Sequence, residues 1–377
     1  MNEFGNLCLT LAWLLSLLGT VFGALSAYKQ NESLILVSKQ KLIAVSSTTL
    51  LALISLGIMF LSDDYSNQYV WQTSNKGMPW IYKITAIWGG MDGSMLLWAS
   101  MLSVSTGIVA LMYKQYPLKL FSWVIPVLHS NLLFFLTLLL FFTNPFRYIA
   151  ADFIPPEGNG LNPLLQNPYM AIHPPMLYLG FTTFAIPFAF CLGALFSNQL
   201  NGDWIKLCRR WSLIAFGFLT TGIVLGGHWA YLELGWGGFW AWDPVENASF
   251  LPWLTATAYL HSVMVQERKG MLKFWSVWLV IITYGLTVFG TFLTRSGIVQ
   301  SVHAFASTDI GFVFLDYLAL IFIVSLIFTI IRRKELKPER TFESIFSRES
   351  AFLVNNLILL SICFATIWGV MFPVFSE

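Results

Sequence analysis

Charge is scarce in this chain. Only 11% of its 377 residues are charged, while 56% are hydrophobic and the mean hydropathy is +0.68. Charged residues make up about a quarter of an ordinary soluble domain. The composition therefore excludes an ordinary soluble globular protein and indicates an integral membrane protein.

Cysteine motifs are also missing. The four cysteines, Cys8, Cys191, Cys208 and Cys363, are scattered, with no Cys-x-x-Cys pair and no Cys-x-x-Cys-His. The sequence thus carries no sign of a thiol redox motif, a zinc site or covalent haem attachment to this chain, and the cysteines are expected to fill apolar space. The N-terminal flank MNEFGN lacks the basic region of a cleaved signal peptide. Solenoid repeats, low-complexity tracts and a soluble domain are absent as well.

Long apolar runs dominate instead. About ten are long enough to cross a bilayer, which takes roughly 17–25 helical residues. They lie near 5–28, 41–62, 92–113, 119–143, 174–197, 211–231, 249–265, 272–293, 311–331 and 351–372. The prediction is an all-α, polytopic helix bundle forming a single membrane domain over residues 1–377. Spacings such as Gly19-xxx-Gly23 permit close helix contacts within it.

The basic residues alternate from side to side along these runs. Seventeen of the 21 Lys and Arg residues fall on one side of the membrane, and Lys76, Lys83, Arg147 and Arg295 fall on the other. The positive-inside rule makes the crowded side cytoplasmic. Both chain termini are then expected outside. The basic connection 332–350 would lie on the anionic inner leaflet.

One connection on the outer side is rich in tryptophan. Residues 236–254 read WGGFWAWDPVENASFLPWL. An aromatic belt at the lipid interface accounts for scattered tryptophans, but not for Trp236, Trp240 and Trp242 followed at once by Asp243. Broad indole faces with few charges suit a large, flat, apolar ligand at a membrane surface. Segment 232–249 is therefore the candidate ligand-binding segment.

Histidines flank this segment in the sequence. His173 and His303 both fall on the outer side, one before and one after the tryptophans. Alone, each would be an ordinary interfacial polar residue. Together they form a candidate pair of axial ligands for haem iron, with the aromatic rings holding the porphyrin. Arg295 is either a helix-end arginine reaching the interface or a partner for haem propionates.

Other histidines lie within the apolar runs. His261 is about twelve residues into its helix, roughly 18 Å deep. Intramembrane ionisable residues are costly and are candidates for function, so His261 is either a packed neutral side chain or the axial ligand of a second, buried haem. His129 lies at a similar depth, where polar packing is equally plausible. His228 is assigned to the interface.

Four motifs resemble one family. They are residues 88–98 (WGGMDGSMLLW), 167–175 (NPYMAIHPP), 233–249 (ELGWGGFWAWDPVENAS) and 290–305 (GTFLTRSGIVQSVHAF). In this order they resemble the CcmF family of cytochrome c haem lyases and their nitrite-reductase-linked relatives, across essentially the whole chain. The family pattern predicts Trp where this chain has Phe239, and His where it has Met91.

The resemblance implies a function. Such proteins take haem from a periplasmic haem chaperone and hold it over the tryptophans between two histidines, here His173 and His303. They promote its attachment to the Cys-x-x-Cys-His of apocytochrome c. A membrane haem b, with His261 matching one ligand, keeps the delivered iron reduced. The implied setting is the bacterial cytoplasmic (inner) membrane, with the haem site facing the periplasm.

The resemblance also predicts partners and leaves alternatives. The expected partners are the chaperone, apocytochrome c and other maturation proteins including a thiol-handling subunit, and not nucleic acid. Family members usually continue well beyond this chain, and the later part carries the other haem b ligand. A second chain carrying the rest of the fold is therefore a further expected partner, with truncation as the alternative. A haem exporter or relay protein without ligation, and a secondary transporter, are the rival functions.

Overall fold

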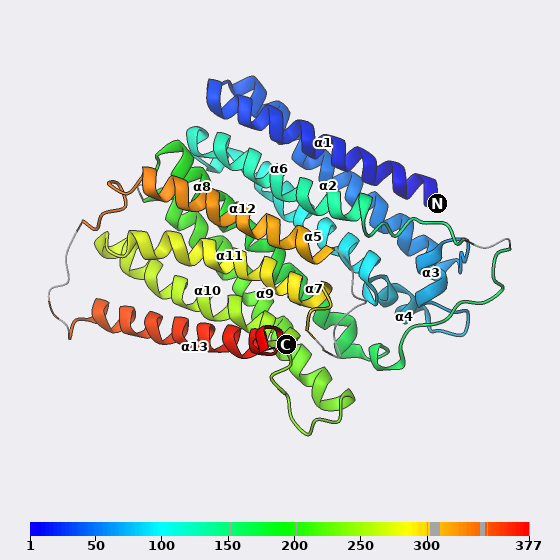
Figure 1. Ribbon diagram of the computed structural model, residues 1–377. Helices are drawn as coiled ribbons and strands as arrows, with labels where there is room; N and C mark the ends of the chain where they lie inside the picture. Colours follow the sequence, from blue (N-terminus) through cyan, green and yellow to red (C-terminus); the bar gives the residue numbers. More distant parts are fainter. Residues whose placement is uncertain are drawn as a thin grey trace. The chain divides into compact units, whose positions relative to one another are not determined.

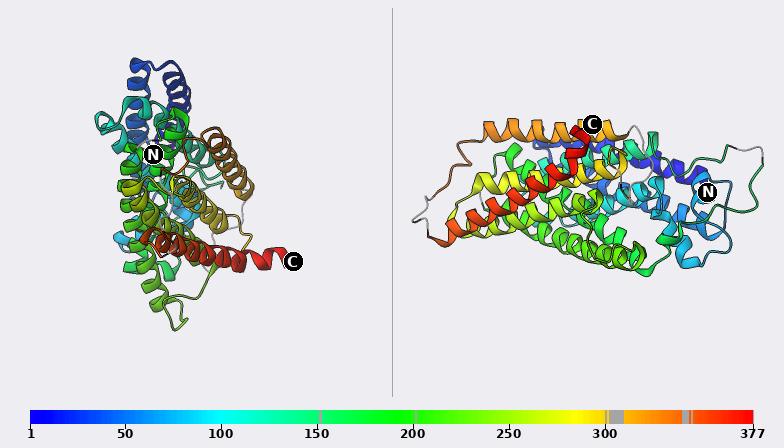
Figure 2. Two further views of the ribbon diagram at one scale, coloured as in Figure 1. Left: turned by 90° about the vertical axis from the view of Figure 1, so that its left-hand side faces the viewer. Right: turned by 60° about the horizontal axis from the view of Figure 1, so that its bottom comes forward.

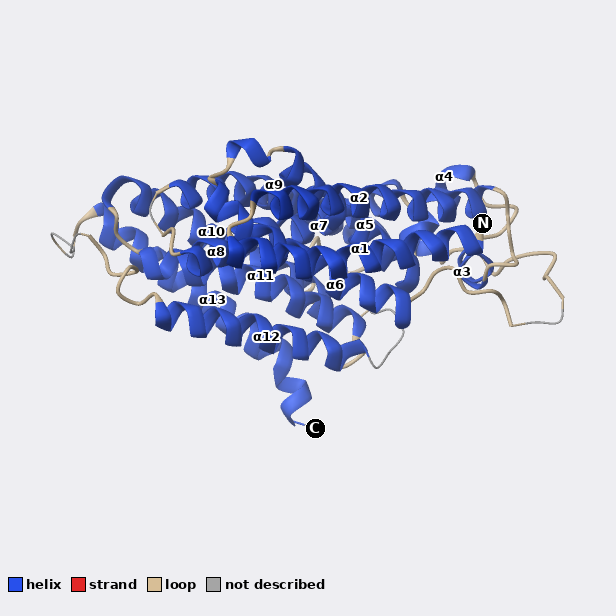
Figure 3. Cartoon of the chain, turned by 90° about the horizontal axis from the view of Figure 1, so that it is seen from above, coloured by secondary structure: helices blue, strands red, loops and turns tan. Residues whose placement is uncertain are grey.

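The described part of the chain is helical (Figures 1 and 3). The structure is a computed structural model that describes residues 1–150, 153–200, 202–299, 301, 310–339, 344 and 346–376. Within these residues no strand occurs, and extended pairing is limited to a bridge between Asn67 and Tyr148. The predicted all-α class is confirmed.

The long helices coincide with the predicted apolar runs. They are α1 (Asn2–Lys29), α2 (Glu32–Leu61), α5 (Met91–Leu111), α6 (Leu118–Phe141), α7 (Pro168–Thr183), α8 (Ala185–Ser197), α9 (Asp203–Glu233), α10 (Pro244–Lys269), α11 (Lys273–Arg295), α12 (Ile310–Ile331) and α13 (Arg348–Ser376). Short helices α3 (Gln68–Thr73) and α4 (Trp80–Thr85) and the 3-10 turns Ala86–Trp88, Tyr113–Gln115 and Pro163–Leu165 lie between them.

Length and composition make this a multi-pass membrane protein. In the described residues, nine helical stretches are long and apolar enough to cross a bilayer, with α7 and α8 counted as one stretch. Helix α10 covers the expected run 249–265 but is not among the nine. Its ends carry Glu246, Glu267, Arg268 and Lys269, which lower its mean hydropathy.

Backbone contacts group the chain into two compact units. The first comprises residues 1–179 and 224–239, and the second comprises residues 180–223 and 240–377. Helices α7 and α9 contribute residues to both units. The single domain expected from the sequence stays a prediction.

Small residues bring helices together in the first unit. Helices α1, α2, α5 and α6 pack on one another, and α1 and α2 form the blue hairpin of Figure 1. A Cβ on Gly19 would lie 2.2 Å from the ring of His129, and one on Gly23 would lie 3.2 Å from the Cα of Pro126. The close contact predicted from Gly19-xxx-Gly23 is therefore confirmed, and its partner is α6.

Polar contacts order the connections of this unit outside the long helices. The ammonium of Lys83 lies 2.6 Å from the carboxylate of Asp63, and both are largely buried. The hydroxyl of Tyr65 donates to Asp63 and to Glu157. A backbone N–H of Lys76 donates to Glu157 and is the main cause of the lowered pKa of that carboxyl. Segments 62–91 and 153–160 are thus held by charge as well as by apolar contact.

The core of the second unit lies between α10, α11 and α13. Buried Leu251, Leu254, Leu286 and Cys363 form one cluster there, and Val265, Met271 and Leu272 form another. Helix α13, red in Figures 1 and 2, packs alongside α10. All four cysteines are buried and free, which confirms that they fill apolar space.

Candidate functional site

The tryptophan-rich segment begins with two glycines in left-handed backbone conformations. Gly235 has φ 65° and Gly237 has φ 69°, and a Cβ on either would meet nothing within 4 Å. These glycines are therefore required by the backbone conformation and not by close packing. They flank Trp236, whose side chain is half-buried.

The motif Asp-Pro-Val-Glu is the start of helix α10. Asp243 is the N-cap residue, and its carboxylate accepts from the N–H of Val245 at 2.9 Å. The carboxylate of Glu246 reaches back to the N–H groups of Ala241 and Asp243. This capping box satisfies N–H groups that a helix start leaves unpaired, and Pro244 suits the first helical position because it has no N–H. The acidic residues after the tryptophans thus set the shape of the loop.

Trp242 has an uncommon backbone conformation. Its φ is 61°, which is rare for a bulky residue and costs about 1–3 kcal/mol. Asn247 holds it in place, because its side-chain amide donates to the carbonyl of Trp242 at 2.8 Å. The indole is 63% exposed. A strained, exposed tryptophan held by a buried asparagine is typical of a contact surface for a ligand.

Aromatic rings continue from this tryptophan into the second unit. Trp240 and Trp242 meet edge to face at 6.3 Å, and Phe250 lies 5.9 Å from Trp240. Phe250 stacks on Trp253, which stacks on Phe216. The Trp240–Trp242 pair therefore rests on a series of half-buried aromatic rings, which restricts its motion.

A second set of rings belongs to the first unit. Tyr169 stacks on His228 at 4.1 Å, and Tyr231 stacks on Phe239 at 4.5 Å. Phe239, which occupies a position where the family pattern predicts Trp, is 57% exposed. His228 is thus held by ring stacking near the end of α9, in line with its assignment to the interface.

His173 lies on α7 in the first unit and is half-buried. Its ring occupies the space left by the missing side chain of Gly226, where a Cβ would lie 2.5 Å from the imidazole. Gly226 therefore leaves the room in which the ring of a candidate ligand is seated. Ile172 beside it is 49% exposed.

The other candidate axial ligand, His303, lies outside the described residues. The chain leading to it is attached to the tryptophan-rich segment. Ser301, two residues earlier, donates its hydroxyl to the carboxylate of Asp243 at 2.8 Å. Asp243 therefore has two roles, as the cap of α10 and as the acceptor for the chain that follows α11.

Variants of Asp243 and Ser301 test the two roles of Asp243 separately. Asp243→Ala should lower the stability of the folded protein by about 0.5–2 kcal/mol, because the helix cap is lost. Asp243→Asn keeps an acceptor and should remain close to the parent protein. Ser301→Ala should leave thermal unfolding in detergent almost unchanged, because it removes only the attachment. Equal melting of the Ala and Asn variants of Asp243 would contradict the capping role.

Arg295 is the last residue of α11 and is only 2% exposed. An arginine that reached the interface would expose its guanidinium. The burial therefore argues against an arginine that reaches the lipid interface. Its contact with haem propionates stays a prediction.

His129 and His261 differ in burial and in the groups that face their rings. His129, in the first unit, is fully buried; its Nε2–H donates to the carbonyl of Ser38 at 3.0 Å, and its ring fills the space above Gly19. Its Nδ1 is buried and has no hydrogen-bond partner among the described residues. The tight fit of the ring against Gly19 is what supports packing as the role of His129. His261, in the second unit, is half-buried, and Nδ1 lies 2.8 Å from the side-chain amide of Asn355. Its Nε2 makes no hydrogen bond to any described residue.

The candidate residues thus fall into several groups. Trp240, Trp242 and Asp243 lie together in the second unit, while His173 and Trp236 belong to the first. His261 is eighteen residues along α10 from its cap, hence roughly 27 Å away along the helix. It belongs to a different site from the tryptophans.

Comparison with known proteins places this arrangement in a family. Residues 88–300 match the cytochrome C assembly protein family. The chain belongs to this family. Its matched region contains the tryptophan-rich segment, His173 and His261, and it ends three residues before His303.

Comparisons with individual proteins support this family membership. The chain is 40% identical over 376 residues to the cytochrome c-type biogenesis protein CycK of Bradyrhizobium diazoefficiens, covering 100% of this chain and 56% of that protein. It is 38% identical over 374 residues to CcmF of Escherichia coli (strain K12), covering 99% and 58%. The solved structure of a cytochrome c heme lyase CcmF matches with a TM-score of 0.82 at 28% identity, covering 100% and 57%. The chain therefore spans little more than half the length of these relatives, and its role is in cytochrome c biogenesis.

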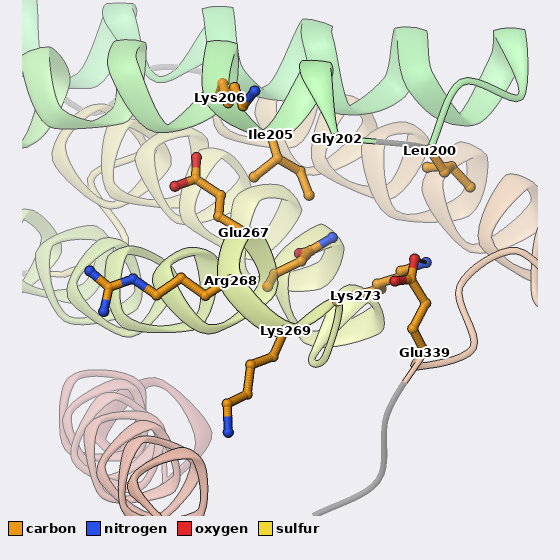
Figure 4. Close-up of a pocket in the computed structure, with 11 residues that line it drawn as sticks. Leu200, Gly202, Ile205, Lys206, Glu267, Arg268, Lys269, Lys273 and Glu339 are labelled. Atoms are coloured by element: carbon orange, nitrogen blue, oxygen red, sulfur yellow. Dashed lines mark hydrogen bonds and ion pairs between the residues drawn. The ribbon is translucent and has the colours of Figure 1, made fainter.

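A pocket of about 400 Å³ lies at the far end of α10 (Figure 4). Its lining includes Lys206, Glu267, Lys273 and Glu339. Lys273 pairs with Glu339 at 2.8 Å, and Glu267 pairs with Arg209. These ion pairs tie α9, α10 and α11 to the chain after α12, and the pocket is separate from the tryptophan-rich end of α10.

Sequence reasoning missed three residues of these sites. Ser301 and Asn355 each act through a partner far away in the sequence, which no local pattern reveals. Tyr169 lies inside a family motif, and only the structure shows its stacking on His228.

Proposed function

We propose that this chain is the haem-handling part of a cytochrome c haem lyase. It receives haem from a periplasmic haem chaperone and promotes its attachment to the Cys-x-x-Cys-His of apocytochrome c. The observation that carries the proposal is the double role of Asp243, which joins the Trp240–Trp242 pair to the chain two residues before His303. His173 and His303 are the proposed axial ligands of the substrate haem.

The proposed reaction is an addition. Each cysteine S–H adds across a vinyl C=C of haem: sulfur bonds to the carbon next to the ring, hydrogen goes to the terminal carbon, and nothing leaves. The tryptophan-rich segment would contribute orientation, because bound geometry converts a bimolecular step into an effectively unimolecular one. Arg295 would contribute a bidentate contact to a propionate.

A resident haem b fits the residues around His261. The side chain is half-buried, one ring nitrogen faces an amide, and the other has no hydrogen-bond partner among the described residues. Such a group would supply one-electron chemistry that keeps the delivered iron ferrous. His261 would hold it as one axial ligand. The second ligand is proposed to come from the part of the family fold that these 377 residues do not include.

The proposed setting is the bacterial cytoplasmic membrane, with the tryptophan-rich segment and both termini on the periplasmic side. The asymmetry of 17 against 4 basic residues supports this orientation. The proposed partners are the haem chaperone, apocytochrome c and other maturation proteins, including a thiol-handling subunit.

Loss of the indoles of Trp240 and Trp242 tests the proposal. Trp240→Ala or Trp242→Ala alone should weaken haem transfer, and the double variant should abolish it, because removing a large aromatic contact costs a few kcal/mol. Covalent haem in the cytochrome product and haem retained by the purified protein are the two measurements. Trp80→Ala is the control, since that indole is 70% exposed on α4. Normal cytochrome maturation in the double variant would refute the proposal, and retained haem without maturation would favour a haem relay.

A further inference from the structure

Helices α10 and α13 of the second unit are joined by two adjacent side-chain contacts. The amide of Asn355 lies 2.8 Å from Nδ1 of His261, and the amide of Asn356 donates to the hydroxyl of Ser262 at 2.7 Å. The ring of Phe352, one turn earlier on α13, lies 5.6 Å from the imidazole. His261 is therefore held in position by α13, which contacts one nitrogen and one face of its ring.

Asparagine at this place is unusual for its helix. Helix α13 is apolar, and its neighbouring side chains Val354, Leu357 and Ile358 are more than half or nearly half exposed. A polar amide in such surroundings is costly unless it is hydrogen-bonded. Asn355 is half-buried and directed at a histidine, whereas Asn356 is fully buried and directed at a serine. Both asparagines therefore carry the cost of placing a polar amide in apolar surroundings, but their hydrogen-bond partners differ.

The partner of Nδ1 decides what Nε2 can do. A neutral imidazole carries one N–H, so a proton on Nδ1 leaves a lone pair on Nε2, and a proton on Nε2 removes it. An asparagine amide offers an oxygen that accepts and an NH₂ that donates, and a half-turn about its last bond exchanges them. When the amide oxygen faces Nδ1–H, Nε2 can bind a metal. When the NH₂ faces Nδ1, as it does in this structure with Nδ2 at 2.8 Å, Nε2 carries the proton and cannot.

We infer that Asn355 is the positioning residue for His261 as a haem ligand. Its amide sets the plane of the imidazole and, after the half-turn that brings its oxygen to Nδ1, keeps the proton on Nδ1 so that Nε2 is free to bind iron. The inference rests on the proposed membrane haem b. It assigns to α13 a direct part in the electronics of that site, since a hydrogen bond to the far nitrogen of a ligating histidine raises the basicity of the ligand.

Two variants of Asn355 and one of its neighbour test this inference in the protein co-expressed with the complementary part of the family fold. Asn355→Leu keeps the size but removes the amide; it should lower b-type haem occupancy by about tenfold, the loss typical of an outer-sphere partner. Asn355→Asp supplies a stronger acceptor; it should retain the haem and lower its midpoint potential. Asn356→Leu removes the neighbouring contact between the same helices and should leave both quantities as in the parent protein.

The measurements are the reduced-minus-oxidised optical spectrum, the midpoint potential and the electron paramagnetic resonance g values, which depend on the orientation of the axial imidazole. If Asn355→Leu and Asn356→Leu give the same occupancy, potential and g values, the inference is overturned. If Asn355→Leu does not accumulate, the potential of Asn355→Asp decides: an unchanged value overturns the inference as well. His261→Ala distinguishes failure of the Asn355 inference from failure of the haem b proposal, because a b-type haem that survives this change refutes the haem b proposal itself.

Discussion

Replacing His173 and His303 together with alanine is expected to abolish the capture of delivered haem. Both axial ligands of the substrate iron would be lost, and removal of even an outer-sphere partner of a metal ligand costs about 10–100-fold in affinity. Each single variant should lower the amount of captured haem or shift its absorption bands. Added imidazole should partly restore the spectrum, because it can occupy the vacated axial position.

The matched control is His228→Ala. This imidazole belongs to the same unit as His173 but stacks on Tyr169, so its loss should leave the axial ligation intact. The measurement is the optical spectrum of the protein purified with its haem chaperone. A double His173→Ala, His303→Ala protein that retains haem with an unchanged spectrum would show that the ligand assignment is wrong.

Replacing His261 with alanine is expected to remove the b-type spectrum of the assembled protein without emptying the outer site. The two sites are separable because His261 is roughly 27 Å along α10 from the cap at Asp243. This chain purified alone should show little stable b-type signal, and co-expression with the complementary half should restore it. A low-spin haem needs two axial ligands, and the second is expected from that half.

His129→Ala is the control for this experiment. Its Nε2–H donates to the carbonyl of Ser38 and its ring fills the space above Gly19, so its loss should destabilise the first unit and leave the b-type spectrum in place. A bis-histidine spectrum from this chain alone, abolished by His129→Ala, would show that both ligands lie in this chain.

Much of the architecture follows from composition and pattern. A chain with so few charges cannot form an ordinary soluble fold, and each expected apolar run is helical because a helix satisfies its own backbone groups in lipid. Helix α2 begins at Glu32, well before the expected residue 41, because the side chain of Asn31 caps it by accepting from the N–H of Leu34. Within the helix, Lys39 and Lys41 reach over the rings of Tyr113 and Phe22. Long lysine side chains can extend from a helix in this way, so charge alone is a poor marker of where a helix starts.

Sequence by itself determined the fold class, the family and the residue types of the tryptophan-rich segment. Sequence motifs are local, and a capping box such as that of Asp243 and Glu246 needs only residues three positions apart, so it can be read from the sequence. Only the tertiary structure shows what surrounds two histidines of similar depth. His129 is fully buried, with its Nε2–H on a carbonyl and its ring against a glycine, whereas His261 is half-buried and meets Asn355, ninety-four residues later in the chain. The physical reason is that the ligand capacity of an imidazole depends on what faces each of its nitrogens, and those partners come from other helices.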